Sequence, residues 1–315
     1  MWERGALAHA GLWVSHRGER ECSDRVTKPS SDHDDPRLTD SDESWPAAAL
    51  RIVYQVVAFR VRKLEMANLA GAVAIMVVLR LPLPDLVFRT LFAALLNVLV
   101  YLNNDYHDVA IDARAPDKDR DKARYLARHM GAALRAQWIL LALLCALALL
   151  HSLGLCLVLV AGGGICWLYS KYLKHTPLLD VAAMAGWGVV MPLCGSPLDR
   201  PLGIALAVQL GLFSAVFETI QVVRDRESDA QLGVRTSAVV LGTRRTFMLT
   251  RGLMVLCAAY GAVVLHPVSG ALALGAVLLP MREGEREAQR LWTYVKAIYG
   301  GAWLLACAFL YVEGR

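Results

Sequence analysis

Several common features are missing from this sequence of 315 residues, and each absence narrows what the protein can be. No C-x-x-C pair occurs, and six of the seven cysteines lie in apolar runs, so we interpret them as small buried residues and not as disulfide partners or zinc ligands. The sequence has no clear internal repeat, which secondary transporters commonly show. It also lacks the D-G-x-x-A-R signature of CDP-alcohol transferases. What remains is a mostly apolar chain, 56% hydrophobic and only 19% charged.

The N-terminal residues differ in composition from the rest of the chain. Residues 23–44 contain seven acidic side chains and almost no aliphatic ones, so this segment cannot bury enough apolar surface to fold alone. The earlier apolar stretch, residues 6–14, is interrupted by His9 and has no good cleavage site after it, which argues against a secretory signal peptide. We predict a disordered acidic tail over residues 1–50 and a transmembrane domain over residues 51–315.

From Leu64 onward, apolar runs of membrane-spanning length recur between short polar loops. We therefore predict an all-α, polytopic bundle of about nine transmembrane helices around a central cavity. Its partner is expected to be the lipid bilayer, with no nucleic acid. The predicted spans are residues 64–81, 86–103, 132–150, 153–169, 178–193, 202–223, 247–265, 268–279 and 294–312.

An acidic stretch, N-D-Y-H-D-V-A-I-D at residues 104–112, ends the second predicted span. If the helix continues through it, Asn104, Asp108 and Asp112 fall at i, i+4 and i+8 and line one face. Asp105 then points elsewhere. Because carboxylates at the mouth of a membrane helix are costly to keep there, we expect this face to have a function.

A second acidic set, D-R-E-S-D at residues 225–229, ends the sixth predicted span. Asp225 and Asp229 are again four residues apart, and Glu218 and Gln221 lie on the same helical stripe. Both acidic sets end spans on the same side of the predicted bundle. Two such faces opposed across the bundle would form a cluster of oxygen ligands.

Carboxylates held this close together repel one another unless a cation lies between them. Oxygen ligands suit Mg²⁺, which prefers carboxylates, water and phosphate oxygens. A bridging Mg²⁺ would neutralise a diphosphate leaving group, and nearby basic residues such as Arg120 would add to this. We predict a Mg²⁺ site for a diphosphate. If that diphosphate is allylic, C–O cleavage leaves a delocalised carbocation for a nucleophile or an internal double bond to capture.

The placement of basic residues predicts the orientation of the bundle. Alternate loops are rich in Lys and Arg, whereas the loops between them hold only Arg80, Arg89 and Arg200. Because Lys and Arg concentrate on the cytoplasmic side, we expect the N-terminus and the mouth of the acidic site to be cytoplasmic. We expect an integral, multi-pass protein of the plasma (inner) membrane, with Arg315 outside.

With these motifs the chain resembles the UbiA superfamily of intramembrane prenyltransferases over about residues 51–312. The first family motif, N-D-x-x-D-x-x-x-D, matches residues 104–112 at every fixed position. The second, D-x-x-x-D followed by a Gly and a Thr, matches Asp225, Asp229, Gly233 and Thr236. The resemblance implies transfer of a prenyl group from an isoprenoid diphosphate to a lipophilic or aromatic acceptor, with Asp108 and Asp225 catalytic. The residues implied to hold Mg²⁺ and the diphosphate are Asn104, Asp108, Asp112, Asp225 and Asp229.

A Tyr and a Lys after the fourth span usually help to position the diphosphate in this superfamily. The matching candidates are Tyr169, Tyr172 and Lys174, with Lys174 catalytic and Lys171 as an alternative. The family often spaces the pair as Y-x-x-x-K, whereas here the tyrosines precede Lys174 by five and two residues. For the tyrosines, an interfacial aromatic anchor is the competing interpretation.

Two departures from the family pattern concern phosphate binding and acceptor choice. No Arg-Pro pair follows the first motif, where Arg120 precedes Asp121 and Arg124 precedes Tyr125. In place of the usual Asn-Asp before Asp225, the chain has V-V-R. A terpene cyclase of the same superfamily, acting on an allylic diphosphate without an acceptor, stays open as an alternative. An ion- or proton-coupled transporter is a more distant one.

Overall fold

The computed structural model describes residues 43–62, 65–112 and 120–314, and every regular element among them is helical. The predicted tail lies outside the described residues up to position 42, and the helix α1 begins within its last part, at Trp45. Short 3₁₀ or π turns carry the label η. The elements in chain order are α1 (Trp45–Arg62), α2 (Ala67–Val78), α3 (Leu83–Asp112), α4 (Arg120–Arg128), α5 (Met130–His151), α6 (Leu153–Lys171), η2 (Leu173–His175), α7 (Leu179–Val190), η3 (Pro192–Gly195), α8 (Pro201–Arg224), α9 (Arg226–Gln231), α10 (Ser237–Leu241), α11 (Thr243–Tyr260), η4 (Gly261–Leu265), α12 (Pro267–Leu274), η5 (Gly275–Leu278) and α13 (Glu285–Glu313).

Every predicted span coincides with an apolar helix. Six helical segments in the described part are long and apolar enough to cross a membrane: those containing α3, α5, α6, α8, α11 and α13. The other three predicted spans correspond to shorter apolar segments, Ala67–Val78, Leu179–Gly195 and Pro267–Leu278. The all-α membrane bundle is therefore confirmed, but helix length alone does not establish the count of nine.

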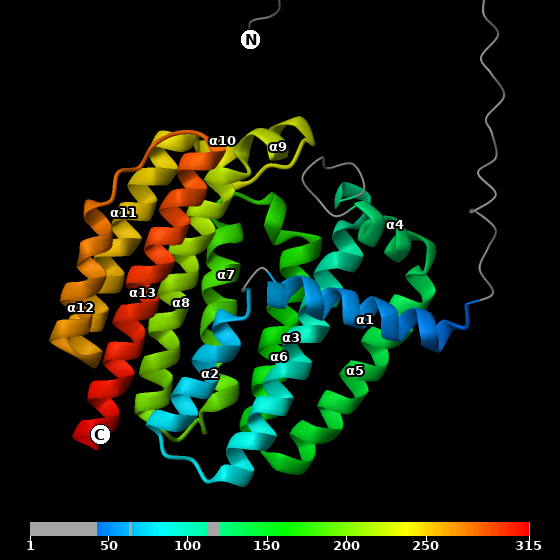
Figure 1. Cartoon of the computed structure of the whole chain (residues 1–315), viewed down its shortest axis with the longest axis horizontal. Helices are drawn as coiled ribbons and strands as arrows, with labels where there is room; N and C mark the ends of the chain where they lie inside the picture. Colours follow the sequence, from blue (N-terminus) through cyan, green and yellow to red (C-terminus); the bar gives the residue numbers. More distant parts are fainter. Residues whose placement is uncertain (1–42, 63–64, 113–119, 315) are drawn as a thin grey trace, which may run out of the picture. The chain divides into compact units, whose positions relative to one another are not determined.

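The helix α8 occupies the middle of one half of the bundle, where it packs against α7, α11 and α13 (Figure 1). Its contact with α7 depends on small residues. A Cβ atom on Gly188 of α7 would overlap the side chain of Ser214 and lie 3.0 Å from the Cα of Gly211 on α8. The two glycines thus let the helix backbones approach closely.

The helix α1 runs crosswise to the long helices (Figure 1). Pro46 stands in its first turn, where a missing backbone N–H costs no hydrogen bond. Arg60 and Arg62 end it, where positive charge favours the helix dipole. One stripe of α1 is buried against Leu102, Leu126 and residues of α5. The buried residues of α1 are Ala48, Ala49, Ile52 and Val56.

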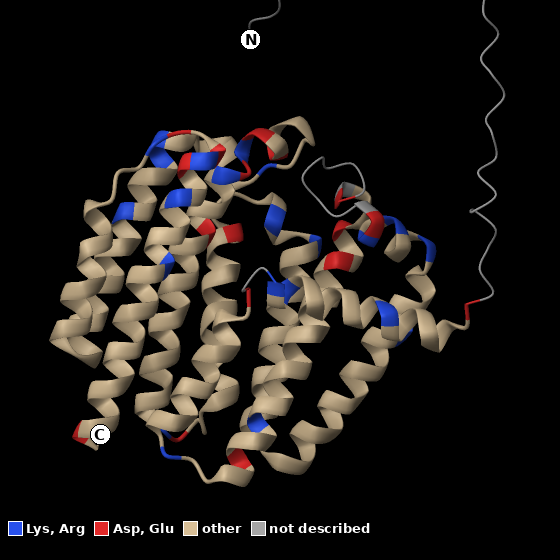
Figure 2. Ribbon diagram, in the orientation of Figure 1, with Lys and Arg blue, Asp and Glu red and all other residues tan. Residues whose placement is uncertain are grey.

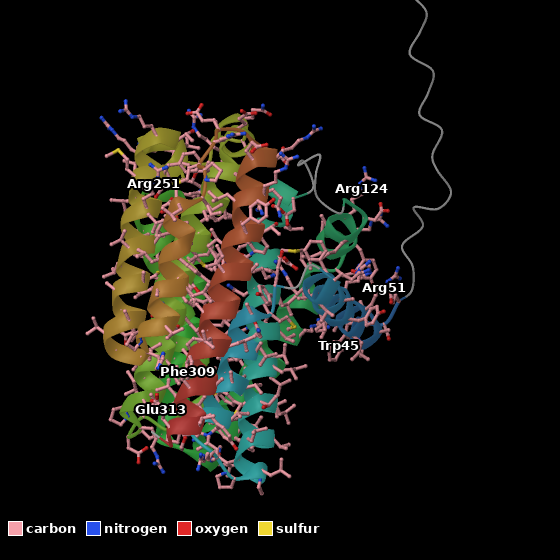
Figure 3. All side chains as sticks on the ribbon, turned by 60° about the vertical axis from the view of Figure 1, so that its left-hand side comes forward. Trp45, Arg51, Arg124, Arg251, Phe309 and Glu313 are labelled. Carbon is pink, nitrogen blue, oxygen red and sulfur yellow. The ribbon has the colours of Figure 1, made fainter. Side chains whose placement is uncertain are left out.

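Charged residues are concentrated at the end of the bundle that carries α4, α9 and α10 (Figure 2). The long shafts of the helices between the two ends are nearly free of charge in the same view. Turned by 60°, the molecule shows Trp45, Arg51 and Arg124 on the part formed by α1 and α4 (Figure 3). Both acidic motifs lie at the charged end, because α3 and α8 both finish there.

Candidate functional site

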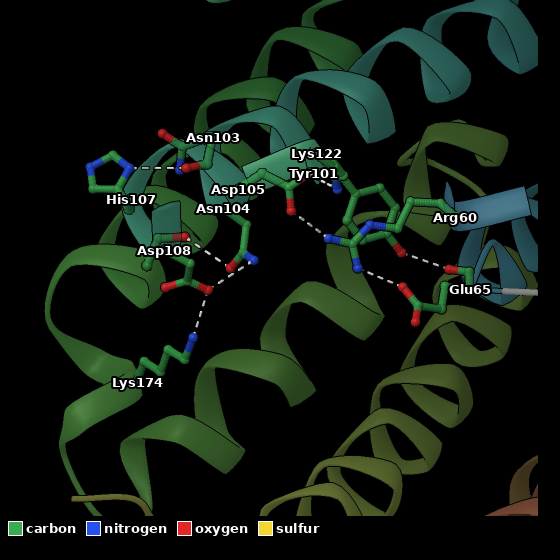
Figure 4. Close-up of polar contacts among 11 residues, drawn as sticks. Arg60, Glu65, Tyr101, Asn103, Asn104, Asp105, His107, Asp108, Lys122 and Lys174 are labelled. Carbon is green, nitrogen blue, oxygen red and sulfur yellow. Dashed lines mark hydrogen bonds and ion pairs between the residues drawn. The ribbon is translucent and has the colours of Figure 1, made fainter. Parts of the chain in front are cut away.

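The first motif occupies the last turns of α3, which remains helical through Asp112 as the spacing required. The side chains of Asn104 and Asp108 face Lys174 of η2 (Figure 4). The Asn104 amide donates to Asp108 Oδ2 over 3.2 Å, and the Lys174 ammonium donates to the same oxygen over 2.6 Å. Ser170 Oγ donates to the Asn104 Oδ1 over 3.4 Å. Asp108 is almost fully buried, so this carboxylate is held in place by its two partners.

Lys174 lies between the two motifs. Burial lowers the pKa of its ammonium, but the carboxylates of Asp108, Asp112 and Asp229 outweigh burial and raise the pKa above its usual value. Those three carboxylates come from α3 and from α9. Both motifs therefore act electrostatically on one lysine.

Asp105 faces away from this cluster, as the spacing predicted. Its carboxylate accepts a hydrogen bond from Arg60 Nη2 over 2.8 Å and from Lys122 Nζ over 2.6 Å (Figure 4). Arg60 also pairs with Glu65 at 2.5 Å. Asp105 thus fixes α1 and α4 to the motif helix.

The second motif is bent, in contrast to the single helical face that we expected. The helix α8 ends at Arg224, and Asp225 adopts φ −89° and ψ 0° before α9 begins. The Asp229 N–H still donates to the Asp225 carbonyl over 2.9 Å, so the two residues remain one turn apart. Arg224 donates two hydrogen bonds of 2.7 and 2.8 Å to the Asp225 carboxylate, and it also donates to the side-chain oxygen of Gln289 over 3.2 Å.

The remaining motif residues shape the turn after α9. Gly233 has φ +74°, a left-handed conformation that favours glycine. The Val234 N–H donates to the Asp229 carbonyl over 2.8 Å, and Thr236 Oγ1 donates to Asp229 Oδ2 over 3.3 Å. The Gly and the Thr of the family motif therefore orient the second aspartate.

The candidate residues after α6 separate into two groups. Tyr169 points inward, and its hydroxyl donates to Glu218 Oε1 on α8 over 3.1 Å. Lys171 and Tyr172 are exposed, and both contact Trp167 instead, with Lys171 Nζ 4.9 Å from the Trp167 ring centre. The structure thus brings Tyr169 and Lys174 to the site, whereas Tyr172 has the exposed position of an interfacial anchor.

Two predicted residues stand at the edge of the described part. Asp112 is the last residue of α3, within electrostatic reach of Lys174. Arg120 is the first residue of α4, and its side chain lies outside the described atoms, as do residues 113–119.

Asp180, which we did not predict as a site residue, lies fully buried at the start of α7. Its Oδ2 accepts the backbone N–H of Ser237 over 2.7 Å, and its Oδ1 accepts the Ser237 hydroxyl over 2.5 Å. The Leu178 N–H donates to the same hydroxyl over 2.7 Å. This clamp ties the segment that follows Lys174 to the residue next to Thr236. A lone carboxylate at the head of an apolar span was the available signal.

The oxygen donors present fit a hard divalent cation in kind. Asn104 supplies an amide oxygen, and the four motif aspartates, Asp108, Asp112, Asp225 and Asp229, supply carboxylates, which are the ligands that Mg²⁺ accepts. Among the described residues, no three His, Cys, Asp or Glu side chains are gathered closely enough to enclose a metal ion by themselves. In this arrangement Lys174 and Arg224 provide the positive charge beside Asp108 and Asp225.

Several solved structures share the fold of this chain. A digeranylgeranylglyceryl phosphate synthase aligns with a TM-score of 0.64 and 18% identity, over 84% of this chain and 99% of that one. A UbiA homologue from Archaeoglobus fulgidus bound to GPP and Mg²⁺ aligns with a TM-score of 0.61 and 17% identity, over 83% and 99% of the two chains. At these identities the likeness establishes the fold.

Sequence relatives include a 4-hydroxybenzoate octaprenyltransferase of Xanthomonas oryzae pv. oryzae, 28% identical over 157 residues, 48% of this chain and 51% of the relative. A digeranylgeranylglyceryl phosphate synthase of Methanospirillum hungatei is 27% identical over 187 residues, 56% of this chain and 64% of the relative. The chain thus matches about half to two thirds of the length of these relatives. The profile of the UbiA prenyltransferase family matches residues 67–297, which include both acidic motifs and Lys174. The chain belongs to the UbiA prenyltransferase family.

Proposed function

We propose that this protein is a Mg²⁺-dependent intramembrane prenyltransferase. It would move a prenyl group from an isoprenoid diphosphate to a lipophilic or aromatic acceptor. The observation that carries the proposal is the position of Lys174, which bonds Asp108 of the first motif and interacts electrostatically with Asp229 of the second. A diphosphate needs such a combination of metal ligands and fixed positive charge.

Each residue of the site has a part in holding the diphosphate. Mg²⁺ bound by Asn104 and the four motif aspartates would neutralise the charge on the phosphate oxygens. Lys174 and Arg224 are already protonated and placed beside those ligands. Both side chains are long enough to exchange a carboxylate oxygen for a phosphate oxygen. Asp180 and Ser237 keep the Lys174 segment in position while this exchange takes place.

The proposed reaction is a substitution at the first carbon of the prenyl chain. The allylic C–O bond breaks, and its electron pair leaves with the diphosphate. An electron pair of the acceptor forms the new bond to that carbon, and the acceptor then loses a proton. Apolar helix walls that exclude water would prevent premature capture of the carbocation.

The acceptor is proposed to be an aromatic, quinone-precursor-like compound. Two relatives are named for different acceptors, 4-hydroxybenzoate in one and a glyceryl phosphate in the other. Neither name decides the acceptor of this chain. Arg224, the last residue of V-V-R, pairs with Asp225 at 2.7 Å, so an anionic acceptor would find positive charge beside Asp225.

The test is release of diphosphate by the purified protein in detergent. Geranyl, farnesyl and geranylgeranyl diphosphates are supplied with Mg²⁺ or with EDTA, with and without 4-hydroxybenzoate, a naphthoate or a glyceryl phosphate, and the products are extracted for mass spectrometry. We expect Mg²⁺-dependent release that requires an acceptor and yields a prenylated product. The control is Asp199→Asn, which removes an exposed carboxylate far from both motifs.

Each other outcome has a definite meaning. A cyclised product from the allylic diphosphate alone would identify a terpene cyclase. Release that persists in EDTA would contradict the role of the metal. No release with any donor and acceptor, from protein that remains monodisperse and helical, would contradict the prenyltransferase proposal as stated.

A further inference from the structure

A cavity of about 510 Å³ lies between α1 and α4. It is separate from the candidate active site. Lys122, which lines it, bonds Asp105, and Asp105 faces away from the Asn104, Asp108 and Lys174 cluster (Figure 4). The wall carries five basic side chains and one carboxylate. These are Arg51, Arg62, Lys122, Arg124 and Arg128, with Asp121.

Most of this positive charge is not balanced within the described residues. Lys122 is paired with Asp105 at 2.6 Å, and Arg124 lies 4.0 Å from Asp121 in an exposed, solvent-screened pair. Arg51, Arg62 and Arg128 form no ion pair with any described carboxylate. Five cations around one cavity repel one another, so an anion bound there would relieve the repulsion.

Contacts within α1 and between α1 and α4 orient the basic side chains around the cavity. The Arg51 guanidinium lies 4.4 Å from the centre of the Tyr125 ring, which orients it, and Arg62 Nε donates to the Ala58 carbonyl over 3.1 Å. Lys122 Nζ lies 4.6 Å from the centre of the Phe59 ring. These contacts hold the basic side chains along the cavity. The Arg62 bond uses only Nε, which leaves its outer guanidinium nitrogens available to a ligand.

The surface of α1 next to the cavity shows which anion fits. Arg51, Gln55 and Arg62 follow one another at i, i+4 and i+11, and so share one side of α1. The stripe beside them, turned away from the buried face, is apolar and exposed to 73% at Leu50 and 72% at Tyr54. Val61, seven residues after Tyr54, is exposed on the same stripe.

A helix with a buried stripe, a basic stripe and an exposed apolar stripe has the pattern of a helix that lies in a membrane interface. Its apolar residues enter the acyl boundary, and its basic residues meet the headgroups. A soluble anion would account for the arginines but not for the exposed Leu50 and Tyr54 beside them. We propose that the cavity between α1 and α4 binds the phosphate of an anionic glycerophospholipid, whose acyl chains lie along the exposed apolar stripe of α1.

The proposed lipid site would also be linked to α3, the helix of the first motif, through two side chains. Lys122 lines the cavity and bonds Asp105, the residue that follows Asn104. A bound headgroup would therefore hold α1 and α4 together against the end of α3. The site is independent of the reaction proposed above, since it needs only the fold and the membrane.

The test is lipid binding to the full-length protein in dodecyl maltoside, measured by native mass spectrometry with phosphatidylglycerol and with phosphatidylcholine. The cavity variant combines Arg51→Gln, Arg62→Gln and Arg128→Gln. The matched control, Arg244→Gln with Arg245→Gln and Arg282→Gln, loses the same charge from exposed positions elsewhere. We expect the affinity for phosphatidylglycerol to fall at least about tenfold in the cavity variant, to change little in the control, and the phosphatidylcholine binding to stay the same.

A second measurement needs no variant. A photoactivatable phosphatidylglycerol, mixed with the wild-type protein, should label peptides within residues 45–62 or 120–128. Labelling confined to other helices would overturn the proposal even if the variants failed to fold. Equal loss of phosphatidylglycerol binding in the control would show that binding depends on the overall charge of the protein, and it would overturn the assignment to this cavity. Stabilisation of the wild type by inorganic phosphate as strong as that by the lipid would assign the cavity to a free anion, and so overturn the lipid assignment.

Discussion

Lys174 and Asp108, 66 residues apart in the chain, form an ion pair of 2.6 Å. One partner belongs to the short turn after α6, and the other to the last turns of α3. The carboxylates of Asp112 and Asp229 also raise the pKa of this lysine, so both acidic motifs act electrostatically on one ammonium.

Replacing Lys174 by Gln should lower kcat/KM by roughly 100-fold, because a fixed positive charge at the diphosphate is lost. Lys174→Arg should recover part of the activity, since it keeps the charge. The control is Lys171→Gln, three residues away and exposed against Trp167. Steady-state kinetics with Mg²⁺ and an allylic diphosphate measure the effect. Equal losses in the Lys171 and Lys174 variants would contradict the special position of Lys174.

Asp108→Ala and Asp225→Ala should each abolish turnover while leaving folding and membrane insertion intact. Both carboxylates are proposed ligands, and neither belongs to one of the apolar core clusters. The measurement is product formation by protein whose circular dichroism and elution volume match the wild type. Activity retained in both purified variants would disprove the assignment of the metal site.

The hydrogen bonds between Asp180 and Ser237 should stabilise the fold by more than the two side chains contribute separately. Asp180→Ala leaves three donors without their acceptor, the Ser237 hydroxyl and the backbone N–H groups of Val181 and Ser237. Unsatisfied buried donors cost about 1–3 kcal/mol each, so the variant should be clearly less stable. A double-mutant cycle with Ser237→Ala, read by thermal unfolding in detergent, should give a coupling of about 1 kcal/mol or more. Additive effects would show that the two side chains act separately.

Gly188→Ala should destabilise the bundle, because the new methyl group would overlap Ser214 on α8. Gly163→Ala is the matched control, since a Cβ atom at Gly163 meets no other atom within 4 Å. We expect a lower unfolding temperature for the first variant and little change, or a slight increase, for the second. The double variant Gly188→Ala with Ser214→Gly should recover part of the loss, since it removes both the hydroxyl and the Cβ atom that the new methyl group would overlap.

The proposed orientation predicts which end of α8 is accessible from outside the cell. Asp199 precedes α8 and Ala230 follows it, so the two exposed positions lie at opposite ends of this helix. In a variant without native cysteines, Asp199→Cys should react with a membrane-impermeant maleimide in intact cells. Ala230→Cys should react only after permeabilisation. The reverse pattern would place the acidic motifs outside the cytoplasm.

The sequence alone determined the class of fold and the residues of both motifs. Apolar runs as long as a bilayer is thick must be helical, because the bilayer offers no other partner for their backbone groups. The family spacing of residues 104–112 and 225–229 is equally local, since each motif lies within a few turns of one segment. These features need no knowledge of which helix neighbours which.

Tertiary structure decided the rest. Only packing brings Lys174 to Asp108 and turns Tyr172 outward, although both follow α6 within three residues of its end. It also pairs Asp180 with Ser237 across 57 residues and sets α1 across the bundle, beside a basic cavity. Contacts between distant segments depend on how whole helices pack, and the period of a single helix carries no information about its neighbours.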